Sequence, residues 1–195
     1  MFVQNTALLT LSILLTACLA APSGEEEPGG RALIAIARAA VVEEVTGVPE
    51  DSRPLPPRET TPQGIFVTVE RKGTVIGCRG GLGIRGRTLQ EEITRAARAA
   101  AGHDPRYRPM TPADLRDFKV TVTLVDSLEP LAAGQIRTLS PGEGLVLTAG
   151  TRTGVVLPWE GKEPIVRLRW AYRKAGIAPG SPCTLRRMIA RRYRG

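Results

Sequence analysis

The stretch IFVTVERKGTVIGC, residues 65–78, carries the strongest structural signal in the chain. Two runs rich in β-branched residues, Ile65–Glu70 and Thr74–Cys78, flank the short polar connection Arg71–Gly73. Such runs joined through a glycine-containing connection are typical of a β-hairpin, because β-branched side chains pack well on a pleated sheet. The sequence therefore predicts two adjacent antiparallel strands here.

Helices and one further strand are predicted around this hairpin. Upstream, Arg31–Val45 has apolar residues at helical spacing and contains no Gly or Pro. Downstream, Thr88–Glu91 forms a capping box that opens a helix, and Thr111-Pro112 predicts the start of a second helix. Lys119–Asp126 alternates apolar and polar residues, as a half-buried strand does. We expect one core to contain Phe66, Val120, Val122 and Leu124, with Leu89 and Ile93 packed on it.

The remaining segments give weaker signals. Glu50–Pro62 contains four prolines and is predicted to be a loop. Pro164–Ala175 predicts a helix that ends at Gly176. The spacing places Ile165, Leu168, Tyr172 and Ala175 on one helical face, and Trp170 is expected to project differently, against the sheet. The tail Arg186–Arg194 is compatible with a helix or a strand, and its five arginines are candidates for contact with acidic lipid headgroups.

Composition places the chain among globular proteins with a basic surface. Hydrophobic residues make up 42% and charged residues 24% of the 195 residues, which excludes a wholly disordered chain and a polytopic membrane protein. Lys and Arg number 27 against 19 Asp and Glu, so the net charge is +8, and its field attracts anionic partners. The single histidine, His103, excludes a His-rich metal site, and we expect no metal.

The amino terminus predicts export and lipidation. Met1–Gly24 holds no charged residue, and its apolar stretch is shorter than the roughly 20 residues that a membrane-spanning helix needs. Leu15–Cys18 resembles a bacterial lipobox, which predicts a lipoprotein signal peptide over residues 1–17 and a lipid anchor on Cys18. A disordered tether over 18–30 and one domain over 31–195 would follow. An apolar tail with a chance cysteine is the alternative.

A lipid anchor on Cys18 would make a membrane the first partner of this protein. Two acyl chains hold a protein firmly at a membrane surface. In bacterial lipoproteins, Asp directly after the lipidated cysteine favours the inner membrane, but here the residue is Leu19. We therefore expect a cell-envelope protein on the outer membrane, facing the periplasm. An exported protein does not normally meet nucleic acid, so no nucleic-acid partner is expected.

Cys78 is the candidate catalytic residue. Strand alternation predicts that Ile76, Cys78 and Gly80 share one face and that Arg79 points to the other. The run Arg79-Gly80-Gly81 reads as a glycine-rich turn whose backbone N–H groups a ligand can approach. A small buried hydrophobic role for Cys78, or a disulfide with Cys183, stays open beside a functional thiol.

Several motifs together resemble the AMMECR domain family. They are Ile76–Gly80 (IGCRG), Asp104–Pro109 (DPRYRP), Gly154–Pro158 (GVVLP) and Lys174–Ile177 (KAGI), and the likeness covers nearly everything from Arg31 onward. The resemblance implies an α+β fold: an antiparallel main sheet with flanking helices, a smaller lobe and a final strand at the tail. The biochemical activity of that family is unassigned, and its motif cysteine is the residue usually proposed as the functional centre, which implies such a role for Cys78.

Three departures from the family pattern weaken the expectation of thiol chemistry. Ile76 replaces a family arginine two residues before the cysteine, Glu143 replaces a histidine, and Tyr172 replaces a second cysteine. A neighbouring cation lowers a thiol pKa and creates the reactive thiolate. Without that cation, we expect Cys78 to be an ordinary thiol.

Other polar residues are candidates for ligand binding or for structure. Asp104 and Arg106 flank Pro105, where a clamp that fixes the loop competes with a ligand site. His103 follows Gly102 at a helix end, where a capping role is more common than a catalytic one. Four arginines form either an anion-binding surface with the glycine-rich run or a solvated helix face: Arg85, Arg87, Arg95 and Arg98.

Two functional hypotheses from different classes follow. The favoured one is a ligand- or partner-binding envelope module, whose ligand is anionic or whose partner is a protein. Its candidate binding residues are Arg79, Gly80, Gly81, Asp104 and Arg106. The alternative is a Cys78-centred modification or redox enzyme with an unknown substrate. The sequence identifies no cofactor for either hypothesis.

The lipidation of Cys18 is directly testable. In a bacterial host, the full chain is expected to fractionate with membranes and to incorporate labelled fatty acid, whereas Cys18→Ser should do neither. Equal membrane partition and an unprocessed mass in both forms would contradict the predicted anchor.

Overall fold

The computed structural model describes residues 28–50, 55 and 61–195. The predicted signal peptide, Cys18 and most of the predicted tether and proline-rich loop therefore lie outside the described residues. In the described part, no helix has both the length and the apolarity that crossing a membrane requires.

Six antiparallel strands form one curled sheet with the order β2-β1-β3-β6-β4-β5. The strands are β1 (Gly64–Arg71), β2 (Thr74–Leu82), β3 (Phe118–Leu131), β4 (Gly144–Ala149), β5 (Arg152–Val156) and β6 (Thr184–Arg194). The helices are α1 (Pro28–Thr46), α2 (Leu89–Gly102) and α3 (Pro164–Ala175), with two short 3₁₀ turns, η1 (Pro112–Leu115) and η2 (Ala133–Thr138). This architecture confirms the α+β prediction, including the hairpin and the final strand.

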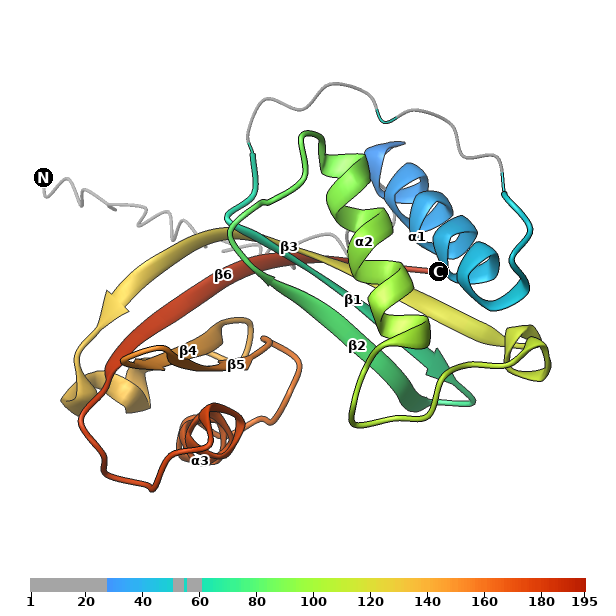
Figure 1. The fold of residues 1–195 in the computed structure, drawn as a ribbon. Coiled ribbons are helices and arrows are strands. Elements are labelled where there is room, and N and C mark those ends of the chain that lie inside the picture. The colour runs from blue at the N-terminus through green and yellow to red at the C-terminus, as the bar shows by residue number, and fades with distance from the viewer. Residues whose placement is uncertain (1–27, 51–54, 56–60) are drawn as a thin grey trace, which may run out of the picture.

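The helices α1 and α2 cover one face of the sheet, and the β4–β5 hairpin with α3 lies on the other side as a smaller lobe (Figure 1). The long strands β3 and β6 pair over most of their length and carry the sheet from one part to the other. The register shifts between Val125 and Ser127. Such a bulge bends a strand, which accounts for part of the curl of the sheet.

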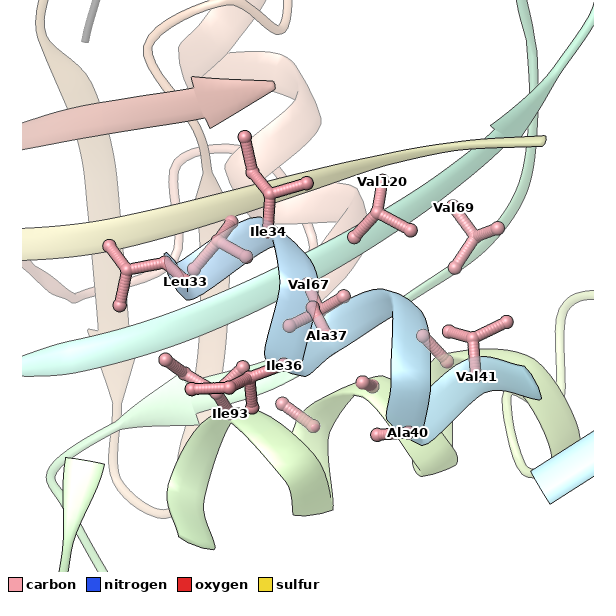
Figure 2. Close-up of a cluster of buried hydrophobic side chains, with 14 of the residues drawn as sticks. Leu33, Ile34, Ile36, Ala37, Ala40, Val41, Val67, Val69, Ile93 and Val120 are labelled. Atoms are coloured by element: carbon pink, nitrogen blue, oxygen red, sulfur yellow. The ribbon is translucent and has the colours of Figure 1, made fainter. Parts of the chain in front are cut away.

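The main core lies between the helices and the sheet (Figure 2). Strand alternation places Val67 and Val69 of β1 and Val120 of β3 on this face, all fully buried. They pack against α1 and against Ile93 of α2. The predicted core membership of Val122, Leu124, Leu89 and Ile93 is confirmed.

The prediction that Phe66 shares a core with Val120, Val122 and Leu124 is wrong. Phe66 alternates with Val67 in β1 and therefore faces the lobe, where it packs with Val125, Val146, Leu157 and Met188. Because the sheet curls, Val146 of β4 meets this face of β1 and β3 in a second apolar cluster. A third cluster, which includes Leu145, Leu147 and Ala171, fills the space between the β4–β5 hairpin and α3.

The face of α3 that the spacing groups together is not uniformly buried. Ile165 is 37% exposed, whereas Arg167 is 1% exposed. Arg167 is held by four backbone carbonyls: those of Ser140, Pro141, Glu143 and Gly161. A buried guanidinium is tolerated when its donors are satisfied, and here they fix the turn that precedes β4.

The helix α1 begins at Pro28, before the expected start at Arg31. The end of the predicted tether is therefore helical. Proline is well suited to the first helical position, because its missing N–H group would have no partner within the helix.

Candidate functional site

Cys78 lies on β2, the edge strand of the sheet, with its side chain on the face that looks toward the lobe. It is directly opposite Thr68 of β1, and the Thr68 hydroxyl donates a hydrogen bond to Cys78 Sγ at 3.2 Å. The thiol is half-buried. Glu160, before α3, and Lys174, on α3, lie near enough to act on it electrostatically. The family motifs around Cys78 and Lys174 are thus brought into one region.

A β-bulge overturns the predicted face of Ile76. The register along β1 and β2 shifts between Val69 and Glu70, which pair with Gly77 and Val75, so Ile76 is the inserted residue. In such a bulge two successive residues oppose one partner, and the simple alternation is lost. Ile76 packs against the helix-side core, away from the Cys78 thiol. Ile76 stands where the family has an arginine, but this position does not lie on the same face of β2 as the Cys78 thiol. The exchange therefore does not explain a loss of thiol reactivity through a missing cation.

Burial raises the pKa of the Cys78 thiol above its ordinary value. The hydrogen bond from Thr68 and the positive charges of Arg106 and Lys174 act in the opposite direction, and the charge of Glu160 acts with burial. Burial is the largest of these effects, since it removes water from the thiolate. Cys78 is therefore a neutral thiol near pH 7.

Asp104 and Arg106 together bind both backbone polar groups of Cys78. Asp104 Oδ2 accepts from the Cys78 amide at 2.9 Å, and Arg106 Nη2 donates to the Cys78 carbonyl at 2.6 Å. The two side chains also pair with each other, through Arg106 Nε and Nη2, at 2.9 and 2.7 Å. Edge strands expose unpaired N–H and C=O groups, and these two side chains take the place of a neighbouring strand.

Asp104 is charged at neutral pH although it is only 5% exposed. Burial alone would raise the pKa of Asp104, but hydrogen bonds from Arg106 and from the Cys78 amide outweigh it and hold the pKa below its ordinary value. The clamp that the sequence suggested for Asp104 and Arg106 is present, and its target is the backbone of Cys78.

A second buried carboxylate anchors the next arginine of the same loop. Arg108 donates to both oxygens of Asp114, at 2.7 and 2.9 Å, and Arg71 donates to the same carboxylate at 3.1 Å. The backbone N–H and hydroxyl of Thr111 complete its contacts. Hydrogen bonds from Arg108 and Thr111 hold the pKa of Asp114 well below its usual range. Asp114 lies in η1, whose position confirms the helix start predicted at Thr111-Pro112.

Residues 104–109, named here the arginine loop, therefore display two anchored cations to solvent. The side chain of Arg106 is 51% exposed and that of Arg108 is 66% exposed, whereas their aspartates are almost fully buried. Tyr107 lies between them in the chain and is 37% exposed. The guanidinium of Arg106 lies 5.5 Å from the Tyr107 ring centroid. Ion pairs to buried carboxylates fix the positions of both guanidinium groups.

The glycine-rich run after Cys78 is not a turn. Arg79, Gly80 and Gly81 continue β2 and pair with Val67, Phe66 and Ile65. At Gly80 the φ angle is +151°, and a Cβ atom would lie 2.1 Å from the Ile65 carbonyl oxygen. The absence of a side chain at Gly80 thus allows close strand approach and carries no sign of ligand binding.

Arg79 remains a candidate binding residue. It is exposed and follows Cys78 at the sheet edge. Within the described ranges, its side chain has no hydrogen-bond or ion-pair partner. It is therefore available to an anion without the loss of an internal contact.

The arginines of α2 and of the tail are mostly engaged within the fold. Arg87, Arg95 and Arg98 form ion pairs with Glu91, Glu92 and Glu43. In the tail, ion pairs join Arg187 to Glu143, Arg191 to Asp126 and Arg194 to Glu70. Arg192 lies over the ring of Trp159. These contacts favour a solvated helix face over an anion site on α2, and they weaken the expectation that the tail binds lipid headgroups.

His103 and Cys183 lie apart from the Cys78 contacts. His103 Nε2 is 3.0 Å from Glu44 Oε1, at the end of α2, so its ring is paired with α1. Cys183 lies near the Tyr172 hydroxyl, and both Cys78 and Cys183 are free, so the disulfide is not formed. No group of three His, Cys, Asp or Glu side chains in the described ranges could hold a metal ion.

Comparison with known proteins identifies relatives over most of this chain. The AMMECR1 family model matches residues 34–195. A protein from Methanothermobacter thermautotrophicus is 32% identical over 176 residues, which cover 82% of this chain and 87% of that protein. A protein from Aeropyrum pernix is 35% identical over 180 residues, covering 85% and 75%. An uncharacterised protein from Pyrococcus horikoshii, of known crystal structure, shares the fold with a TM-score of 0.70 at 24% identity, covering 85% of this chain and 90% of that one.

The chemistry of Cys78 can be tested by alkylation with iodoacetamide and peptide mapping. Because its pKa is raised, Cys78 should react more slowly than glutathione at pH 7, and its rate should still increase with pH where a free thiol has levelled off. Thr68→Val removes the hydrogen bond that favours the thiolate and should slow the reaction further, whereas Thr68→Ser should preserve the wild-type rate. Wild-type Cys78 that reacts faster than glutathione would contradict the neutral thiol.

Proposed function

We propose that this chain, which belongs to the AMMECR1 family, is a binding module for an anionic partner. Its motif cysteine is a neutral thiol, which favours binding over thiol chemistry. The proposed binding surface is Arg79 together with the arginine loop, beside the edge of β2 that Asp104 and Arg106 cover. The observation that carries the proposal is the anchoring of Arg106 and Arg108 on buried carboxylates, which leaves both cations half-exposed.

The charge balance of this region favours an anion. Four guanidinium groups meet only two carboxylates here, so two positive charges are in excess: Arg71, Arg79, Arg106 and Arg108 against Asp104 and Asp114. The net charge of +8 adds a long-range attraction. Because the buried aspartates already fix the arginine positions, a partner would lose less side-chain entropy on binding.

The second candidate is a Cys78-centred modification or redox enzyme. The hydrogen bond from Thr68 and the nearby charges of Arg106 and Lys174 favour it, since each stabilises a thiolate. Two observations weigh against it. Burial has the larger effect on the thiol, and the chain's single histidine contacts Glu44 of α1, which covers the face of the sheet opposite to the Cys78 thiol.

We also propose that Cys18 anchors this module at the cell envelope, on the grounds of the lipobox-like sequence alone. The family relationship gives this part of the proposal no support. A lipid anchor would place the arginine loop within reach of partners at a membrane surface.

The binding proposal can be tested with the full-length protein and a short fluorescein-labelled oligoglutamate, followed by fluorescence anisotropy at low salt. Arg79→Glu reverses a cation that has no partner among the described residues, so it should weaken binding about three- to tenfold without a change in the unfolding midpoint. Arg137→Glu is the matched control, because it makes the same charge change on η2 in the lobe. Binding that is insensitive to Arg79→Glu, or equally weakened by Arg137→Glu, would contradict the proposed surface.

A further inference from the structure

A small cavity lies directly against the arginine loop. It measures about 90 Å³ and is lined by Ile76, Tyr107, Arg108, Met110 and Asp114. Tyr107 and Arg108 are exposed at its rim, whereas Met110 and Asp114 are buried. The bulge in β2 contributes to this cavity, because it turns Ile76 to this side of the sheet.

The lining makes the cavity suitable for an apolar group. Ile76, Met110 and the Tyr107 ring supply apolar surface. Asp114 is charged, but its two oxygens already accept five hydrogen bonds, from Arg71, Arg108 and Thr111. A carboxylate offers about four lone-pair positions, so Asp114 has no acceptor capacity left for a ligand. A hydrogen-bond donor in this cavity would therefore find no free acceptor on Asp114, whereas an apolar group has no hydrogen bond to lose on entering.

The size of the cavity limits what can enter. A water molecule takes up roughly 30 Å³ in the liquid, and a cavity of about 150 Å³ holds a benzene molecule. At about 90 Å³ the cavity is too small for an aromatic ring and suits a branched aliphatic side chain.

The cavity lies close to the two anchored cations of the arginine loop. Tyr107 is part of the rim and stands between Arg106 and Arg108 in the chain, with Arg106 close to its ring. An aliphatic side chain that enters beside Tyr107 would therefore lie near both cations. Tyr and Arg, like Trp, are enriched among the residues that dominate binding energy at protein interfaces.

We infer that the partner is a protein segment in which a leucine-like side chain is flanked by aspartate or glutamate residues. This inference rests on the proposed function and specifies its ligand. The aliphatic side chain fills the cavity beside Tyr107, and the flanking carboxylates pair with Arg106 and Arg108. A nucleic acid offers the negative charge without the aliphatic group, so it would bind independently of the cavity.

The test compares two labelled acidic peptides on the full-length protein, EEDLDEE and EEDADEE. The leucine peptide should bind roughly tenfold more tightly, because only leucine fills the cavity. Tyr107→Ala should abolish this preference while the weaker binding of the alanine peptide persists. Ile165→Ala is the matched control, since Ile165 is exposed to the same 37% but lies on α3, and it should keep the preference.

The outcomes separate the two proposals. Equal binding of both peptides that still depends on Arg79 would overturn the inferred ligand and leave the anionic surface in place. Binding of neither peptide would overturn both. A single-stranded oligonucleotide that binds more tightly than the leucine peptide and depends on Arg79 but not on Tyr107 would also overturn the inferred ligand, and would identify a nucleic acid as the anion.

Discussion

The Asp104 carboxylate is the contact on which the arrangement of this region depends. It accepts from the Cys78 amide on one side and from the Arg106 guanidinium on the other, while Arg106 closes the ring by donating to the Cys78 carbonyl. An open sheet edge is thereby covered by two side chains. The same contacts fix the start of the arginine loop, and Asp114 fixes its end through Arg108. The Asp104 hydrogen bonds thus both cover the sheet edge and position Arg106, while those of Asp114 position Arg108.

This arrangement gives the family motifs a physical role. The sequence DPRYRP supplies an aspartate and an arginine for the edge, a second arginine for Asp114, and a tyrosine between them. Cys78 is joined to this loop through its backbone, and its thiol points to the lobe side, toward Thr68. A role for the Cys78 backbone in holding the loop does not require a reactive thiol. Ile76, which stands where the family has an arginine, forms part of the wall of the cavity beside Tyr107 and gives it an apolar surface.

The sequence was sufficient where local periodicity controls the structure and insufficient where partner strands control it. The hairpin, the helix N-cap at Thr88 and the alternation in β3 are local properties, and the structure confirms them. Which side of the sheet Phe66 and Ile76 point to depends on the strands and the core cluster that each residue packs against. A bulge is created by the register between two strands, which one sequence does not reveal. The glycine-rich run was predicted to be a turn because glycines are typical of turns. Gly80 is instead required by the close approach of β1, which the sequence of β2 alone does not reveal. Buried Arg167 was missed because an arginine on an amphipathic helix is normally exposed.

Hydrogen exchange at the Cys78 amide tests the importance of the Asp104 contact most directly. In the wild-type protein this amide should be protected, although it faces the open edge of the sheet, because Asp104 accepts its hydrogen bond. Asp104→Asn removes the charge at nearly constant volume and should greatly increase exchange at Cys78 and in the arginine loop. The amides of Val67 and Leu124 in the interior strands should stay protected. Protection of the Cys78 amide that is unchanged in Asp104→Asn would contradict the view that this charged contact holds the loop to the sheet.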